Sequence, residues 1–364
     1  MANSLQEYLY NLATDKEKGI LADLFKPILL ILSFIYGLAV RCLVFLNRLF
    51  AVRLGCKVIS VGNITLGGTG KTPLVEYIAR YLKAQGHKVV ILTRGYRRTV
   101  QSPQSTVHSA TIDCKTMGDE PYMLFKRLTD IPMVIDRDRI RGARKAIKDY
   151  PADTVLLDDG FQQWRIKKDL EIVTLDAANP FGNRCLLPRG ILREPLSALG
   201  RPDIIVLTKT NLAQALKPLK EYLTRINAGA LLIESKHSPC GFYNIADPRE
   251  SFPNESFRGK NAVLFCGIAD PDSFEKITRG LGINSASFFK FEDHHCYTDK
   301  DLEKITHASK ASNTQIIITT EKDAARLCGR DLSRLGRILA LRIELTVREN
   351  EQGLHNRLLN LYSL

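Results

Sequence analysis

A glycine-rich turn that joins an apolar run to an amphipathic stretch constrains the fold of this chain most strongly. It lies within VISVGNITLGGTGKTPLVEYIARYL, residues 58–82. The run Val58–Val61 predicts a short buried strand, and Leu74, Ile78 and Leu82 recur at helical spacing beyond the turn. A strand that ends in glycines and leads into a helix directs backbone N–H groups and the helix N-terminus toward a phosphate. The order of these features predicts a phosphate-binding loop in an α/β domain.

The segment GGTGKT has the composition of a nucleotide-binding loop. The residues expected to bind the nucleotide are Gly67, Gly68, Thr69, Gly70, Lys71 and Thr72. Lys71 is expected to reach the β- and γ-phosphates of ATP, and the Thr72 hydroxyl is expected to bind Mg²⁺. The usual spacing requires glycine at position 65, where this chain has Thr65. The alternative interpretation is a tight strand-to-helix turn with an incidental lysine.

Further apolar runs continue the alternation of strands and helices. In the first part of the chain they are Lys88–Gly95, Asp153–Gly160, Leu170–Asp176 and Asp203–Lys209. These runs are almost continuously apolar, which is typical of parallel strands covered on both faces. In the second part the expected strands are Asn261–Asp270, Thr314–Asp323 and Arg337–Val347. The predicted fold is α/β, with a P-loop NTPase-like parallel sheet domain, a second and smaller α/β domain, and an N-terminal hydrophobic helix.

This fold predicts three segments along the chain. They are a membrane-associated helical segment at 1–55, a P-loop kinase core at 56–210, and a smaller α/β domain at 211–364 whose last strand can return to the core. The first boundary follows the end of the apolar segment. The second lies where a polar, lysine-rich stretch begins, from Thr210 to Arg225.

The N-terminal apolar run is shorter than a bilayer-spanning helix. Pro27–Val40 carries no charge, and Arg41 interrupts the apolar sequence before it continues. A helix that crosses a bilayer needs about 20 apolar residues. We therefore expect a helix that lies in or dips into the membrane interface, with Lys26, Arg41, Arg48 and nearby Arg53 close to the lipid headgroups. A buried core helix and a single membrane span are the alternatives.

The charge balance favours anionic partners. The chain has 52 Lys+Arg against 39 Asp+Glu, a formal net charge of +13. Such a surplus suits nucleic acid, a phospholipid surface or a phosphorylated substrate. Because the sequence lacks the interleaved aromatic and basic residues of RNA-binding modules, we expect no nucleic-acid partner.

Polar residues follow two of the expected strands where a ligand would lie. VLLDDGFQQW places Asp158 and Asp159 just beyond a strand, and Asp158 is the preferred Mg²⁺ ligand because adjacent side chains diverge. In TRGYRR, Arg94 would meet a phosphate and Tyr96 a sugar ring, at the strand end where open α/β sheets bind ligands. A common Asp-Asp-Gly turn and a solvated basic turn are the alternatives.

Two distant stretches, GDEP and FEDHHCYT, contain titratable groups in turn-like settings. A carboxylate that orients a histidine is a standard way to form a general base for a hydroxyl. The adjacent His294 and His295 also permit a metal site, although no third ligand has a recognisable spacing. Taken alone, either histidine fits an ordinary surface position.

Seven motifs in this order resemble those of the tetraacyldisaccharide 4'-kinase family, the lipid A kinases of Gram-negative envelope synthesis. They are VGNITLGGTGKTP, TRGYRR, GDEP, LDDGFQQ, PFGNRCLLPRGILREP, FEDHHCYT and TTEKDAARL. The resemblance implies that ATP with Mg²⁺ phosphorylates the 4'-hydroxyl of an acylated glucosamine disaccharide 1-phosphate. It also implies a protein at the cytoplasmic face of the bacterial inner membrane, in contact with phospholipid, and we expect a monomer.

The resemblance also implies roles for individual residues. Asp119 and His294 would form the dyad that activates the acceptor hydroxyl, with Lys71 as the third catalytic residue. The absence of glycine at position 65 is the family's own pattern. Residues implied to bind metal or to line the site are Asp158, Asp159, Gln162, Arg193, Glu194 and Arg139.

Two other classes of function fit parts of the pattern. A soluble P-loop kinase or ligase for small molecules would need no apolar N-terminus. A membrane-associated nucleotide switch would hydrolyse nucleotide to drive a partner, and VLTKT faintly resembles a guanine-recognition loop, although the aspartate expected there is Asn211. ADP release that depends on a lipid acceptor separates a kinase from a switch.

Overall fold

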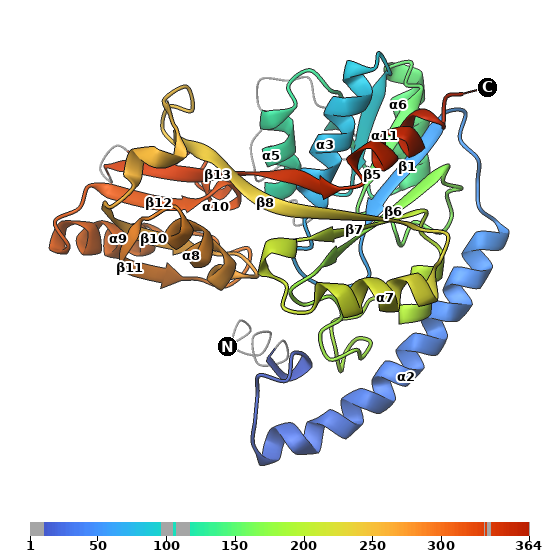
Figure 1. The fold of residues 1–364 in the computed structure, drawn as a ribbon, viewed down its shortest axis with the longest axis horizontal. Coiled ribbons are helices and arrows are strands. Elements are labelled where there is room, and N and C mark those ends of the chain that lie inside the picture. Colours follow the sequence, from blue (N-terminus) through green and yellow to red (C-terminus); the bar gives the residue numbers. More distant parts are fainter. Residues whose placement is uncertain (1–10, 96–104, 107–116, 331, 333–335, 364) are drawn as a thin grey trace. The chain divides into compact units, whose positions relative to one another are not determined.

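The computed structural model describes residues 11–95, 105–106, 117–330, 332 and 336–363 (Figure 1). Clustering of its contacts divides the chain into two compact units. Unit 1 comprises Met1–Arg94, Asp130–Lys236 and Leu345–Leu364, and unit 2 comprises Gly95–Thr129 and His237–Glu344. The strands β8 (Leu231–Asn244) and β13 (Arg337–Glu349) each begin in one unit and end in the other.

A parallel sheet forms the centre of unit 1. Its strands, in spatial order from β8, are β7 (Ile204–Thr208), β6 (Leu170–Asp176), β1 (Lys57–Gly62), β5 (Thr154–Asp158), β2 (Val89–Thr93) and β4 (Met133–Ile135). All pairings between these neighbours are parallel. The expected strands of the first part of the chain are confirmed: β2, β5 and β7 are shorter than expected, β6 has the expected bounds, and β1 is one residue longer at each end. β4 and β8 were not expected.

Helices pack on this sheet. Because its strands are covered, most of their residues are apolar. The helices of unit 1 are α2 (Ile20–Leu49), α3 (Lys71–Ala84), α6 (Arg139–Asp149), α7 (Leu216–Ile226) and α11 (Glu351–Leu359), with short 3-10 helices η1 (Leu196–Gly200) and η2 (Thr210–Leu212). Leu74, Ile78 and Leu82 of α3 are fully buried, as their spacing predicts. Gly86 ends this helix with a positive φ of 88°.

The lysine-rich stretch after β7 lies in unit 1. Leu219 and Leu223 of α7 belong to the same core cluster as Leu207 of β7 and Val173 of β6. The amphipathic face of α7 therefore covers the first sheet, which a boundary near residue 210 did not anticipate. The expected domain boundaries at residues 55 and 210 remain predictions. They differ from the bounds of the two compact units.

In unit 2 the strands pair in parallel in the order β11 (Asn284–Lys290), β10 (Asn261–Cys266), β12 (Ile316–Thr320) and β13. Its other elements are β3 (Ser105–Thr106), α5 (Asp119–Arg127), β9 (Ser251–Phe252), η3 (Asn254–Phe257), α8 (Pro271–Gly280), α9 (Asp299–Ala311) and α10 (Glu321–Arg326). Leu264 packs in one core cluster with Phe274 of α8, and Phe265 packs in another with Leu302 of α9. The alternation of these two strand residues covers both faces of the sheet.

The expected strand Thr314–Asp323 changes to a helix before its end. β12 stops at Thr320, whose hydroxyl accepts a hydrogen bond from the backbone N–H of Asp323 at 3.2 Å. This contact caps α10 and places Asp323, the last residue of the expected strand, on a helix that continues to Arg326.

The N-terminal helix α2 spans 30 residues (Figure 1). Most of its apolar side chains are exposed. Within the described part of the chain, it is the one helix long and apolar enough to cross a membrane, judged by length and composition alone. Its buried residues are Ala22, Ser33, Gly37 and Val40. Two of its side chains attach it to the segment that precedes Pro195: Ser33 donates to the Leu186 carbonyl at 2.7 Å, and Tyr36 to the Arg193 carbonyl at 2.9 Å. This exposure excludes the buried core helix as an interpretation.

Candidate functional site

The glycine-rich loop has the geometry of a phosphate cradle. Gly67 and Gly70 adopt positive φ values of 104° and 79°, which non-glycine residues rarely do. α3 begins at Lys71, directly after Gly70. A Cβ atom added at Gly67 or Gly68 would meet no atom of the described residues within 4 Å. The loop therefore has open space beside it, at the positively polarised end of a buried helix.

The pairing of the loop's first residues explains why position 65 is not glycine. Residues 64–66 run alongside the segment before Pro195, because the Leu66 N–H donates to the Ile191 carbonyl at 2.8 Å and the Arg193 N–H to the Ile64 carbonyl at 2.7 Å. Thr65 forms an antiparallel bridge with Leu192 between these contacts. Extended backbone of this kind needs no positive φ, so threonine fits.

The two adjacent aspartates at the end of β5 have different partners: Asp158 is the last residue of the strand, and Asp159 follows it. Asp158 is buried and accepts a hydrogen bond from the Thr93 hydroxyl at 3.1 Å. Asp159 lies 3.7 Å from Lys71 Nζ and accepts a hydrogen bond from Arg193 Nη1 at 2.9 Å. Burial alone would raise the pKa of Asp159, but the positive charges of Lys71 and Arg193 lower it to about 2. Asp159 therefore connects Lys71 of the loop to Arg193, which lies near the end of the motif PFGNRCLLPRGILREP.

Arg139, at the start of α6, carries buried hydrogen-bond donors that have no acceptor. Its side chain is only 3% exposed, and Nη2 donates to the Asp158 carbonyl at 3.0 Å. Within the part of the chain that the structure describes, Nε and Nη1 have no hydrogen-bond acceptor. Burial lowers the pKa of Arg139 to about 10, while the charges of Asp158 and Asp159 act to raise it. Buried unpaired N–H groups are costly in free energy, so this guanidinium is suited to an anionic ligand.

Glu194 and Gln162 form hydrogen bonds beside the segment that leads from β1 into the loop. The fully buried Glu194 carboxylate accepts hydrogen bonds from Gln162 Nε2 at 3.0 Å and from Arg201 Nη1 at 2.7 Å. Gln162 Nε2 also donates to the Asn63 carbonyl at 3.0 Å. The side-chain nitrogen of Gln162 and the carboxylate of Glu194 are thus hydrogen-bonded to other protein groups. In this they differ from Arg139, two of whose donors have no acceptor among the described residues.

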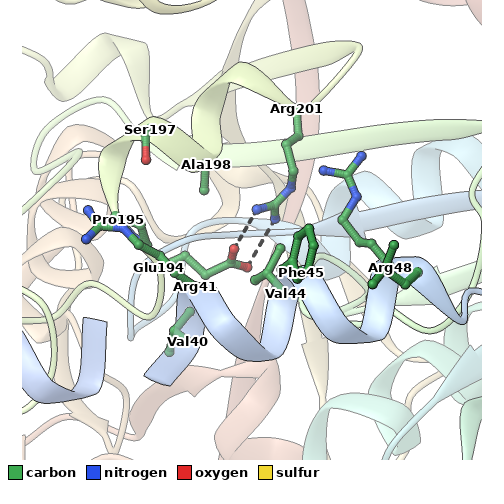
Figure 2. A pocket seen from close by; sticks show the side chains of 11 residues that line it. Val40, Arg41, Val44, Phe45, Arg48, Glu194, Pro195, Ser197, Ala198 and Arg201 are labelled. Carbon is green, nitrogen blue, oxygen red and sulfur yellow. Dashed lines mark hydrogen bonds and ion pairs between the residues drawn. The ribbon is translucent and has the colours of Figure 1, made fainter. Parts of the chain in front are cut away.

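A cavity of about 480 Å³ lies between α2 and the segment Glu194–Arg201. Figure 2 shows Arg201 pointing at Glu194, while Arg41 and Arg48 of α2 stand on either side of Val44 and Phe45. This cavity joins the apolar face of α2 to a cluster of arginines.

Two expected site residues follow β2. Arg94 is exposed at the end of that strand. Tyr96 lies outside the described residues.

The expected dyad is assembled within unit 2. His294 Nδ1 lies 2.7 Å from Asp119 Oδ2, although the two residues are 175 positions apart. The Glu120 backbone N–H donates to Asp119 Oδ1 at 2.9 Å, because Asp119 is the first residue of α5. The His294 backbone N–H donates to the Gly267 carbonyl at 3.1 Å. Burial alone would raise the pKa of Asp119, but its hydrogen bond with His294 and the charge of Arg326 hold this pKa well below the usual value.

His295 has a different set of contacts. Its Nε2 lies 3.1 Å from Asp301 Oδ2, and its ring stacks on Phe291 with the ring centres 4.6 Å apart. Asp301 also caps α9 through Thr298. The structure therefore separates the two histidines: His294 contacts Asp119, and His295 contacts a helix start.

Arg326 is a further member of this cluster that sequence reasoning did not assign. Its Nε and Nη2 donate to Asp119 Oδ2 at 3.0 and 2.6 Å. Its only signal in the sequence is a place in the motif TTEKDAARL, where it follows Asp323 by three positions.

The chain is similar throughout its length to proteins of known activity. The sequence profile of the tetraacyldisaccharide-1-P 4'-kinase family matches residues 25–363. A tetraacyldisaccharide 4'-kinase of Halothermothrix orenii is 34% identical over 351 residues, which cover 92% of this chain and 91% of that protein. One of Pelobacter propionicus is 34% identical over 354 residues, 95% of this chain and 96% of that protein. A crystal structure of LpxK from Aquifex aeolicus in complex with ATP matches with a TM-score of 0.73 and 28% identity, over 93% of this chain and 100% of that one.

Proposed function

Since this chain belongs to the tetraacyldisaccharide-1-P 4'-kinase family, we propose that its Gly67–Thr72 loop holds ATP while Asp119 and His294 activate the acceptor hydroxyl. The activity of the family is ATP-dependent phosphorylation of the 4'-hydroxyl of a tetraacyldisaccharide 1-phosphate, a step of lipid A biosynthesis. The product is the 4'-phosphorylated lipid A precursor. Unit 1 supplies the residues for the nucleotide, and unit 2 supplies those for the proton.

The positive groups around the loop are assigned to the phosphates of ATP. The open backbone at Gly67 and Gly68 and the start of α3 receive phosphate oxygens. Lys71 is assigned to the transferring group, where charge accumulates in the transition state. The unpaired donors of Arg139 supply a second positive contact, and Arg94 stands at the neighbouring strand end.

The residues at the end of β5 and the start of α3 fit a magnesium ion bound with ATP. Thr72 and Asp158 are buried oxygen donors, and hydroxyl and carboxylate oxygens are ligands that Mg²⁺ prefers. When bound, Mg²⁺ would neutralise part of the phosphate charge.

His294 is assigned as the acceptor of the substrate's proton. With Nδ1–H donating to Asp119, the lone pair of the neutral ring is on Nε2. In the proposed step this nitrogen takes the proton of the 4'-hydroxyl as the oxygen bonds to the γ-phosphorus. The bond from the γ-phosphorus to the β–γ bridging oxygen breaks, and ADP leaves. Asp119 stays ionised and orients the ring.

The exposed face of α2 supports contact with a membrane. Its outward apolar side chains include Phe34, Ile35 and Phe45, which are 74%, 57% and 65% exposed. Such a face is costly in water and suits an interface. We propose that α2 holds the enzyme at the cytoplasmic side of the inner membrane, where ATP and the acylated substrate are both present.

One observation carries the assignment of the dyad: the 2.7 Å contact between His294 Nδ1 and Asp119 Oδ2. Two family motifs far apart in the sequence are brought together by the fold, in the geometry of a histidine oriented by a carboxylate.

The test of the proposed function uses ATP labelled at the γ-phosphate, purified protein and tetraacyldisaccharide 1-phosphate in mixed micelles. The expected result is transfer of the label to the disaccharide, with the new phosphate on the 4'-oxygen. ADP release should require the acceptor. Equal ADP release without the disaccharide would favour a nucleotide switch instead, and a label on another hydroxyl would contradict the assigned acceptor.

A further inference from the structure

The guanidinium of Arg326 touches both members of the proposed dyad. Besides its two hydrogen bonds to Asp119 Oδ2, its Nη2 lies 3.3 Å from His294 Nδ1. The side chain is 7% exposed. A fixed positive charge therefore stands next to the imidazole ring and on the same carboxylate oxygen that the ring contacts.

A second buried carboxylate holds Arg326 in this position. Arg326 Nη1 donates to Asp323 Oδ1 at 2.8 Å and to the Gly267 carbonyl at 2.5 Å. Asp323 is fully buried, and it also accepts hydrogen bonds from the Gly267 N–H at 3.0 Å and from the Tyr297 hydroxyl at 2.8 Å. These contacts fix the guanidinium from the side opposite to Asp119.

Gly267 connects this support to the histidine. Its carbonyl accepts from Arg326 Nη1 and from the backbone N–H of His294. A Cβ atom at this position would stand 2.9 Å from the Glu292 carbonyl oxygen and 3.0 Å from His295 Cβ, so only glycine fits without a shift. The positions of Arg326 and His294 are therefore set by one backbone carbonyl.

The charges of Asp119 and Arg326 act on the ring in opposite directions. An ionised carboxylate in contact with Nδ1 favours a doubly protonated, positive imidazole. A positive imidazole has no lone pair and accepts no proton from a hydroxyl. A guanidinium beside the same ring disfavours the second proton. Arg326 thus offsets the side effect of the carboxylate that orients the ring.

We propose that Arg326 is a positioning residue of the dyad: its guanidinium, held by Asp323 and Gly267, fixes the Asp119 carboxylate and opposes the binding of a second proton to the His294 ring. This inference rests on the proposed function and adds to it the group that keeps the base able to accept a proton. Arg326 touches Asp119 and His294 and is assigned no contact with substrate.

Other charged or titratable groups also surround this ring. From α5 they are Asp119 and Glu120, from α10 Lys322, Asp323 and Arg326, and from the loop of His294 itself Asp293, His295 and Tyr297. Lys322 pairs with Glu120, and His295 with Asp301. Asp293 Oδ2 lies 3.8 Å from His294 Nε2 and favours the protonated ring, as Asp119 does. Arg326 is the cation in direct contact with both Asp119 and His294.

The test compares Arg326→Met, which removes the charge, with Arg326→Lys, which keeps it. Single-turnover phosphoryl transfer is measured from pH 5.5 to 9 at saturating ATP and acceptor. For Arg326→Met the acidic limb of the profile should move to higher pH by about one unit or more, with most of the rate recovered at high pH. Arg326→Lys should return the limb toward its wild-type position. A rate lowered by the same factor at all pH values, or an equal shift in both variants, would overturn the inference.

Arg127→Met is the matched control. Arg127 is another buried arginine of unit 2, paired with Glu321 at the start of α10, and its Nη2 donates to the Ile343 carbonyl at 3.0 Å. Its loss should lower thermal stability without moving the acidic limb. If Arg127→Met moved the limb as much as Arg326→Met, a general effect of lost buried charge would replace the proposed one.

Arg326→Met leaves Asp323 buried without its cation, which is itself destabilising. The double variant Arg326→Met with Asp323→Asn removes that unpaired charge and keeps the test available if the single variant fails to fold. The same shift of the limb is expected.

A direct measurement separates this inference from the proposed function. The ring nitrogens of ¹⁵N-labelled His294 are followed by NMR as the pH is varied, without ATP or acceptor. In Arg326→Met the second proton should bind at higher pH than in the wild type, and Nδ1 should be the protonated nitrogen of the neutral ring. An unchanged titration would overturn the role of Arg326 whether or not the protein is a kinase. Failure of acceptor-dependent transfer in the wild type would overturn the proposed function alone.

Discussion

The two proposed sets of functional residues differ in how the chain assembles them and in what they leave unpaired. In unit 1 the loop follows β1 directly, and Asp158 ends the neighbouring β5. In unit 2, Asp119 meets a histidine 175 positions away and an arginine 207 positions away. The first set belongs to the ends of adjacent parallel strands, and the second is created by tertiary contacts.

The same two regions differ in hydrogen bonding. Among the described residues, Arg139 buries two donors without an acceptor, and the loop glycines Gly67 and Gly68 have open space beside them. Asp119, in contrast, accepts from Glu120, Arg326 and His294. Asp323 accepts from four groups, of which Arg326 is one. The nucleotide region is thus prepared for charge that a ligand brings, whereas the dyad region is satisfied by its own residues and keeps its geometry without a ligand.

The largest effects are expected from one substitution in the loop of unit 1 and one in the dyad of unit 2. Together they test whether the first region binds ATP and the second does not. Lys71→Met should lower the rate of phosphoryl transfer about 10³-fold and weaken ATP binding, because it removes charge from the transferring group. Asp119→Asn should lower the rate by about 10²-fold or more while the KM for ATP stays within about threefold. Steady-state kinetics with varied ATP provides both numbers. A KM for ATP raised equally by both substitutions would give Asp119 a binding role.

A smaller effect is expected from substitutions of the arginines on α2. Like Arg139, these side chains are available to bind an anion. Arg41 and Arg48 have no hydrogen-bond or ion-pair partner in the described part of the chain, and they line the cavity of Figure 2. Arg41→Gln with Arg48→Gln should weaken binding to vesicles containing phosphatidylglycerol about 30-fold, at about 1 kcal/mol for each arginine. Vesicle co-sedimentation measures this change.

The control for α2 is Arg144→Gln with Lys148→Gln on α6, which removes the same charge from exposed positions on another helix. These substitutions should leave vesicle binding close to the wild type. An equal loss in the control would show that net charge, and not the position on α2, decides the affinity.

A loop glycine offers a test of the open space in unit 1. Gly68→Ala should leave the thermal midpoint unchanged, because a Cβ there meets no protein atom within 4 Å. If phosphates occupy that space, the added methyl group should weaken ATP binding about tenfold. The reason is that it would push the phosphates away from the backbone N–H groups of the loop. Gly55→Ala also meets no atom within 4 Å and lies outside the loop, so it should change neither property. Calorimetric titration with ATP distinguishes the outcomes.

The smallest expected effect concerns acid stability of unit 2. The pKa of Asp119 is lowered from the ordinary value of 3.8, so its stabilising contribution is present above that pH and is lost as the pH falls toward the lower pKa of the folded state. Asp119→Asn should therefore cost about 1–3 kcal/mol near pH 7 and less as the pH falls from 5 to 3. Thermal unfolding of both proteins at several pH values measures the gap. A gap that stays constant across this range would contradict the ionised pair.

Local patterns allowed the prediction of the nucleotide region. Its strands are continuous apolar runs, and its loop is a contiguous glycine-rich segment before a helical stripe, so each signal lies within a few residues. Asp158 could be placed because it follows such a strand. The expected dyad came from the resemblance of two motifs to a family, since no local pattern relates Asp119 to His294.

The remaining features depend on contacts that a local pattern does not encode. β4 is apolar and buried but has only three residues, too few to stand out as a strand. β11 lies at the edge of its sheet with half-exposed or exposed side chains, so it lacks a continuous apolar run. Arg139 lies in a stretch rich in basic residues, and nothing in that local pattern marks it as buried. It is 3% exposed because α6 packs its side chain beside Asp158. The role proposed for Arg326 depends on its contact with Asp119, which lies 207 positions away in the sequence. In each case tertiary packing decides the environment.

The central claim is that His294 accepts the proton of the acceptor hydroxyl, and its neighbour His295 allows the most direct test. Single-turnover transfer from γ-labelled ATP to the tetraacyldisaccharide 1-phosphate is measured for the wild type, His294→Asn and His295→Asn. The account predicts a rate lowered at least about 100-fold by His294→Asn and within about threefold of the wild type for His295→Asn. A His294→Asn protein that folds, binds ATP normally and transfers phosphate at close to the wild-type rate would contradict it.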